Sequence, residues 1–128
     1  MTYSGGFATC YLVENMETKR QYAAKVISKS ILVKPKTKQK LMSEIRIHKS
    51  VSQKNIVQFY HVFENDYNVY ILLEVCSNSN MFELIRERKK LTIPEVQYYI
   101  YQLIQALSYL HHKMIIHRDV KLGNLFIN

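Results

Sequence analysis

The chain has 128 residues and a mass of 15.2 kDa, which is the length of one typical domain. Hydrophobic residues make up 48% and charged residues 22% of it, a composition that excludes a disordered or collagen-like protein. With only three glycines and two prolines, the sequence favours helices and a few longer strands over a sandwich of many short strands joined by tight turns.

The positive charge is concentrated in one segment. The formal net charge is +8, and residues 17–54 alone hold eleven basic and two acidic residues. Nucleic acid could bind such a segment, but residues 28–49 contain no phenylalanine, tyrosine or tryptophan on which bases could stack. We therefore favour a solvated basic helix face and expect no nucleic-acid partner. A basic nucleic-acid module is the rival interpretation, and it predicts binding that falls steeply with salt.

Cysteine content and hydropathy indicate where the chain resides. Cys10 and Cys76 are too few for a disulfide framework and lack the CxxC spacing of zinc or redox sites, which fits a reducing compartment. The longest purely apolar run, residues 69–73, is far shorter than the roughly 20 residues that cross a bilayer. Residues 1–10 show no secretion signal. We expect no membrane partner and a location in the cytoplasm and nucleus.

Four segments are predicted to be strands. Residues 7–14 and 20–28 are rich in β-branched and aromatic residues and flank a polar turn, which predicts an antiparallel hairpin. Residues 56–63 and 68–75 repeat this pattern, and their continuous apolar runs predict strands that are buried on both faces.

Helical spacing follows in three places. After Pro35, the residues Leu41, Ile45 and His48 fall on one face of an amphipathic helix. A polar break at residues 77–80 marks a lobe boundary and precedes a short helix over residues 80–89.

The third helix has a sharper start. Thr92 and Glu95 form a T-x-x-E capping box, and Pro94 lies in the first turn, where its missing N–H costs nothing. Apolar residues at helical spacing continue from there to His111. Residues 115–128 are then expected to form a loop between short strands.

Residues 117–124 read HRDVKLGN and match H-R-D-x-K-x-x-N, the catalytic loop of protein kinases. Phosphoryl transfer depends on positioning, so a carboxylate must meet the attacking hydroxyl while an amide oxygen holds a metal ion nearby. Asp119 would be that carboxylate and Asn124 the metal ligand. Lys121 would neutralise charge on the γ-phosphate, as in the serine/threonine class, and Arg118 would bind a phosphate on an activation loop.

Two upstream residues fit the same chemistry. Lys25 ends the segment YAAK on a predicted strand, and Glu44 follows nineteen residues later on the helix after Pro35. These spacings suit a strand lysine that a helix glutamate holds against the α- and β-phosphates of ATP.

A partial glycine-rich loop precedes the first full strand. In residues 4–10, SGGFATC, Gly5 takes the second glycine position of G-x-G-x-x-G-x-V, while Ala8 takes the third and Cys10 the valine position. Tyr3 stands where that motif has its first glycine.

These motifs make the chain resemble the first half of a protein kinase catalytic domain, and the Polo-like kinases in particular. The similar segments are residues 5–11, 22–25, 44–50, 69–76 and 121–126. The resemblance implies that Leu73 is the gatekeeper and that Glu74 and Cys76 offer hinge backbone groups to adenine. Ala23, Cys10 and Phe126 would then pack on the purine faces, and free thiols are implied at both cysteines. The nucleotide-binding set implied by the resemblance is Gly5, Gly6, Phe7, Ala8, Cys10, Ala23, Lys25, Leu73, Glu74, Cys76 and Phe126.

The resemblance also implies a fold and an activity. We expect an α+β fold with residues 1–76 as a kinase N-lobe, built from a five-stranded antiparallel sheet and one long helix. Residues 77–128 would begin the C-lobe and end before the D-F-G segment, so the chain as written is expected to be an inactive part of the enzyme. The implied function is transfer of the ATP γ-phosphate to serine or threonine of protein substrates, with Mg²⁺, in mitosis at centrosomes, spindle poles and kinetochores. The rival interpretation is a non-catalytic, pseudokinase-like binding fragment.

Overall fold

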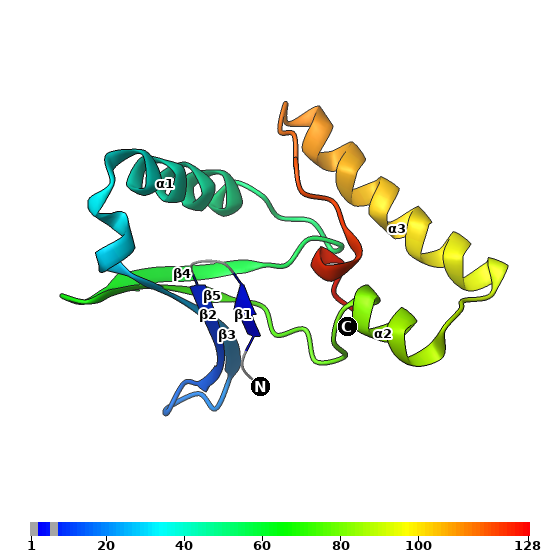
Figure 1. Ribbon diagram of the computed structural model, residues 1–128, viewed down its shortest axis with the longest axis horizontal. Coiled ribbons are helices and arrows are strands. Elements are labelled where there is room, and N and C mark those ends of the chain that lie inside the picture. The colour runs from blue at the N-terminus through cyan, green and yellow to red at the C-terminus, as the bar shows by residue number, and fades with distance from the viewer. Residues whose placement is uncertain (1–2, 6–7) are drawn as a thin grey trace. The chain divides into compact units, whose positions relative to one another are not determined.

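Figure 1 shows a computed structural model of the chain, which describes residues 3–5 and 8–128. The contacts divide the chain into two compact units. One comprises residues 1–52 and 57–75, and the other comprises residues 53–56 and 76–128. The predicted boundary lies after residue 76, and the assignment of residues 53–56 to the second unit has no counterpart in the sequence pattern.

The first unit contains a five-stranded antiparallel sheet in the order β1-β2-β3-β5-β4. The strands are β1 (Tyr3–Gly5), β2 (Ala8–Glu14), β3 (Gln21–Ser28), β4 (Phe59–Glu64) and β5 (Asn68–Leu73). Both predicted hairpins are therefore confirmed, although β4 begins three residues later than expected.

Asparagine side chains close both hairpins. Asn15 Oδ1 accepts the backbone N–H groups of the residues two and three positions later, and Asn65 Oδ1 does the same in the β4–β5 turn. Such local bonds satisfy turn backbone groups that no strand partner reaches. The turns are thus set by residues within a few positions of one another.

Helix α1 (Pro35–Lys49) follows the 3₁₀ turn η1 (Lys29–Val33) and lies over one face of the sheet (Figure 1). Leu41 and Ile45 are its only buried residues. They form a cluster with three sheet residues, Ile27, Phe59 and Ile71. His48 adds a hydrogen bond of 2.7 Å from its Nε2 to the carbonyl of Val57. The predicted amphipathic helix is confirmed, and its apolar face is the one that covers the sheet.

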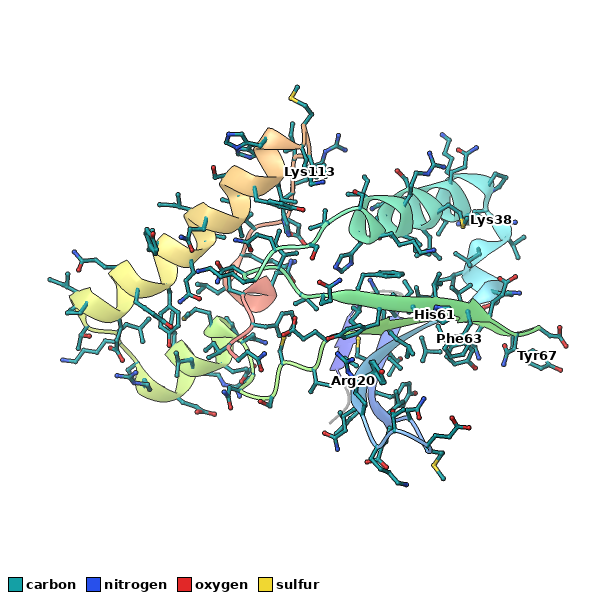
Figure 2. All side chains as sticks on the ribbon, turned by 180° about the vertical axis from the view of Figure 1, so that it is seen from behind. Arg20, Lys38, His61, Phe63, Tyr67 and Lys113 are labelled. Carbon is teal, nitrogen blue, oxygen red and sulfur yellow. The ribbon has the colours of Figure 1, made fainter. Side chains whose placement is uncertain are left out.

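The expectation that β4 is buried on both faces is wrong. Tyr60, His61 and Phe63 are exposed, and Figure 2 shows His61 and Phe63 along this strand. The reason is that β4 is an edge strand and only one face of the sheet lies under α1. On the other face, the ring of Phe63 stacks on that of Tyr70 at a centroid distance of 5.0 Å.

The second unit contains α2 (Met81–Arg88), α3 (Ile93–His112) and the 3₁₀ turn η2 (Leu122–Asn124). Asn80 is buried and caps α2, because its Oδ1 accepts the N–H of Glu83 at 3.0 Å. At the start of α3, the Glu95 carboxylate accepts bonds from both the backbone N–H and the hydroxyl of Thr92, each at 2.8 Å. Both predicted helices are confirmed.

The expected short strands after residue 115 do not form. In the described chain, the segment makes a single β-bridge, between Asn80 and Phe126. Much of the apolar stripe of α3 is exposed: Val96, Ile100 and Ile104 keep 44%, 47% and 58% of their surface in solvent. Among the described helices, none has the length and apolar character that crossing a membrane requires.

Candidate active site

The HRDVKLGN loop brings together two predicted catalytic residues, Asp119 and Lys121, and the predicted metal ligand, Asn124. Asn124 Nδ2 donates hydrogen bonds of 2.9 Å to both the backbone carbonyl and the carboxylate Oδ2 of Asp119. Lys121 Nζ lies 3.1 Å from the same Oδ2. The turn η2 makes this possible, since it folds the chain back so that residues five positions apart can touch. The resulting Asp119–Lys121–Asn124 cluster lies wholly within the second unit.

These contacts set the charge of Asp119. The Lys121 ammonium and then the Asn124 amide donate hydrogen bonds to its carboxylate, which lowers the pKa of Asp119 below its usual range. The side chain is 63% exposed, so water can reach it. An ionised, accessible carboxylate can accept a hydrogen bond from a hydroxyl group and orient it.

The backbone conformation of the HRDVKLGN loop could not be predicted from its sequence motif. The N–H of Asp119 donates to Nδ1 of His117 at 3.2 Å, so His117 supports the loop from within. Arg118 has a φ of 70°, in the left-handed region that residues other than glycine rarely adopt. A conformation of this kind costs about 1 kcal/mol or more and is typical of functional loops.

The register of the sheet gathers a second group of predicted residues. Cys10 pairs with Lys25 across β2 and β3, and Ala23 pairs with Leu73 across β3 and β5. Because side chains alternate along a strand, these four residues and Ala8 occupy one face of the sheet. That face also carries Ile27 and Ile71 of the core cluster. The sheet thus presents small and apolar side chains with one ammonium group among them.

The electrostatics of Cys10 reflect this surface. Burial raises the pKa of its thiol, and the neighbouring Lys25 ammonium lowers it by a smaller amount. Both Cys10 and Cys76 are free cysteines, as expected.

Glu44 is exposed on α1, and no ion pair joins it to Lys25 in the part of the chain that the structure describes. Glu44 lies three positions after Leu41 and four before His48, so it borders the side of α1 that meets the sheet.

The remaining predicted residues are placed as follows. The N–H of Glu74 donates to the carbonyl of Gln58 at 2.9 Å. The Glu74 backbone could therefore meet a nucleotide only by accepting a hydrogen bond at its carbonyl oxygen. Cys76 and Phe126 belong to the second unit. Gly5 ends β1, and its Cα partner is Ala8. The predictions for Gly6 and Phe7 concern residues that lie outside the described part of the chain.

Comparison with known families decides the assignment. Residues 4–128 match the protein kinase domain. The chain belongs to this family. The expected α+β kinase fold is thereby confirmed, with its sheet and long helix in the first unit.

Several relatives are Polo-like kinases or carry related names. The probable serine/threonine-protein kinase CCRP1 of Zea mays is 56% identical over 128 residues, which is 100% of this chain and 20% of that protein. The probable serine/threonine-protein kinase PLK of Dictyostelium discoideum is 56% identical over 97% of the chain and 13% of its own length. The serine/threonine-protein kinase polo of Drosophila melanogaster is 49% identical over 97% of the chain and 22% of its own length. The chain therefore spans less than a quarter of these relatives.

Protein kinases use ATP and Mg²⁺, and the donor atoms of this kinase domain fit one side of such a site. Asn124 uses its Nδ2 to hold Asp119, which leaves its Oδ1 as the atom that would ligate Mg²⁺. Within residues 3–5 and 8–128, no group of three or more histidine, cysteine or acidic side chains could hold a metal ion. The chain would thus contribute a single amide oxygen, beside one carboxylate, to such a site.

Proposed function

We propose that this chain supplies the nucleotide-binding and catalytic-loop residues of a Polo-like protein kinase that phosphorylates serine and threonine. The observation that carries the proposal is the cluster of Asp119, Lys121 and Asn124, in which a carboxylate is held within 3.1 Å of an ammonium and 2.9 Å of an amide. This combination provides what phosphoryl transfer asks of a protein, namely orientation of a hydroxyl and neutralisation of phosphate charge.

In the proposed reaction, the hydroxyl oxygen of the substrate forms a bond to the γ-phosphorus of ATP. The bond from that phosphorus to the β–γ bridging oxygen breaks, and ADP leaves. Asp119 orients the hydroxyl and takes its proton, and Lys121 balances charge on the transferred group. Mg²⁺, when bound, offsets the charge of the phosphates, with Asn124 as its ligand. A lysine at position 121 supports specificity for serine and threonine.

The first unit is proposed to hold the nucleotide. The face formed by Ala8, Cys10, Ala23 and Leu73 offers apolar contacts for a purine, and Lys25 projects an ammonium from the same face for the α- and β-phosphates. Glu44 is proposed to hold Lys25 in place. Contact of Glu74, Cys76 and Phe126 with adenine is proposed on the resemblance alone.

Residues 1–76 are proposed to act as the nucleotide lobe, and residues 77–128 to begin the second lobe of the kinase. We also propose that the kinase acts in cell division. Its proposed locations are the cytoplasm and nucleus, with centrosomes, spindle poles and kinetochores. The role in cell division is supported by a relative named cell cycle serine/threonine-protein kinase CDC5/MSD2 in Saccharomyces cerevisiae, which is 48% identical over 97% of the chain.

A non-catalytic binding role is the second candidate. The observation that favours it is the lack of an ion pair between Lys25 and Glu44 in the described residues, because a kinase needs this lysine held against the phosphates. Under this alternative the chain binds a protein or a nucleotide but transfers no phosphate.

A chimeric protein distinguishes the kinase from the non-catalytic binding role. Residues 1–128 are joined to the remainder of the kinase domain of the Dictyostelium relative, and transfer of labelled phosphate from ATP to casein is measured. We expect transfer that Asp119→Asn and Lys25→Met each reduce by at least about 10²-fold. The matched controls are Asp66→Asn and Lys54→Met, which make the same chemical changes at exposed sites.

The outcomes are distinct. Activity that survives both site substitutions would refute the assigned roles. A folded chimera that binds ATP but transfers no phosphate would favour the non-catalytic alternative.

A further inference from the structure

A strongly charged surface lies on α1. We call it the basic face of α1, and its six residues, all exposed, surround the part of the helix that is not buried. They are Lys34, Lys36, Lys38, Lys40, Arg46 and Lys49. Glu44 is the only acidic residue of the helix. Lys38 is visible on this helix in Figure 2. The helix therefore carries a large positive excess that its own residues do not neutralise.

The rest of the described chain does not neutralise it either. The ion pairs there use five other cations, each matched to a nearby carboxylate: Lys19, Lys29, Arg86, Arg88 and Lys121. None of the six residues of the basic face joins an ion pair among the described residues. Lys49 lies 5.9 Å from the centre of the Phe59 ring, which is a contact with an aromatic face and leaves its charge uncompensated.

The position of the lysines adds to the imbalance. A helix N-terminus carries partial positive charge, so acidic residues are favoured there and lysines are not. In α1 the first turn has no acidic residue, and the N-cap, Lys34, makes no side-chain capping bond. Lys36 and Lys38 lie in or next to this turn. The local sequence thus opposes the helix dipole, and a bound anionic partner would relieve that opposition.

Spacing indicates the form of such a partner. Lys36 and Lys40 are four residues apart, so they lie about 6 Å from each other on one side of the helix. This side is opposite to Leu41 and Ile45, which are buried against the sheet. In an extended peptide, alternate side chains repeat about every 6.6 Å on one side. A segment with an acidic residue at every second position therefore matches the lysine row.

We propose that the basic face of α1 is a docking surface for an extended acidic segment of a partner protein. A membrane is less suited, because stable binding of an amphipathic helix to lipid needs a free apolar face, and α1 uses its apolar face in the core. Nucleic acid is less suited as well, because residues 34–49 contain no phenylalanine, tyrosine or tryptophan for base stacking. The surface belongs to the first unit and the Asp119 cluster to the second, and this proposal does not depend on catalysis.

The test measures binding of a fluorescein-labelled peptide with six Glu-Ser repeats to the 128-residue chain by fluorescence anisotropy. A peptide of six Gln-Ser repeats is the uncharged control. We expect the double variant Lys36→Glu/Lys40→Glu to weaken binding about tenfold, and Lys36→Gln/Lys40→Gln to weaken it about threefold. The matched control is Lys54→Glu/Lys90→Glu, which changes the net charge equally at exposed sites in the second unit and should alter binding less than twofold.

Circular dichroism of each variant shows that the fold is retained, which is expected because glutamate is favoured near the start of a helix. An equal loss of binding in the control double variant would overturn the proposal, since net charge alone would then explain it. Tighter binding to vesicles with 30% phosphatidylserine, or to a twelve-nucleotide oligothymidine, lost in the same α1 variant, would overturn it in favour of lipid or nucleic acid.

Discussion

Ile45→Ala should loosen the attachment of α1 to the sheet. Ile45 is 8% exposed and, with Leu41, is one of the two buried residues of the helix. It packs in the cluster that includes Phe59 and Ile71 of the sheet. Since these contacts set the rotation of α1, they also govern where Glu44 lies relative to β3.

The magnitude follows from what is removed. Replacing isoleucine by alanine deletes three carbon groups, each worth about 0.8 kcal/mol when buried, and the cavity that remains adds to the loss. Alanine recovers a few tenths of a kcal/mol through its higher helix propensity. We expect a loss of about 2 to 4 kcal/mol for the first unit. The matched control, Ile47→Ala, makes the same change at a side chain that is 42% exposed, and should cost about 1 kcal/mol or less.

Hydrogen exchange of the α1 backbone amides is the suitable assay, because it reports the first unit separately from the second. Each 1.36 kcal/mol corresponds to a factor of ten, so protection should fall about 30- to 900-fold in Ile45→Ala. Equal loss of protection in the two variants would refute the view that Ile45 anchors the helix.

Three further outcomes are expected. Bonds from Arg88 and Thr92 lower the pKa of Glu95 to about 2, so its contribution to α3 is complete above its usual value near 4.5 and is lost as the pH falls toward 2. In Glu95→Gln, circular dichroism from pH 7 to 2 should therefore show a flatter loss of helix, and an unchanged profile would contradict this. In Lys121→Met, the pKa of Asp119 should rise, because the hydrogen bond that most stabilises its charged form is lost. Carbon-13 NMR titration measures this pKa, and a constant value would argue against the contact between Lys121 and Asp119. Ile104 is 58% exposed and belongs to an apolar surface of α3 that favours self-association. Ile104→Lys should therefore raise the protein concentration at which light scattering first detects aggregates. An unchanged concentration would show that another surface drives the aggregation.

The features that could be predicted from the sequence depend on residues close together in the chain. Asn15 and Asn65 close their hairpins through bonds to residues two and three positions away. The start of α3 depends on bonds between Thr92 and Glu95. Asp119 meets Asn124 only five residues later, within one tight loop. In each case the chain between the partners is too short to separate them, so residue type and spacing suffice.

Other features required the tertiary structure. The apolar residues of β4 resemble those of a buried strand, but Phe63 lies on the face of the sheet that α1 does not cover, so it is exposed. Strand pairing placed Cys10 beside Lys25 and Ala23 beside Leu73, which no local pattern specifies. The orientation of Glu44 depends on how Leu41 and Ile45 pack against three separate strands. Local spacing determines which face of an element is apolar, but what covers that face is decided by segments distant in sequence, through the free energy of burying all of them together.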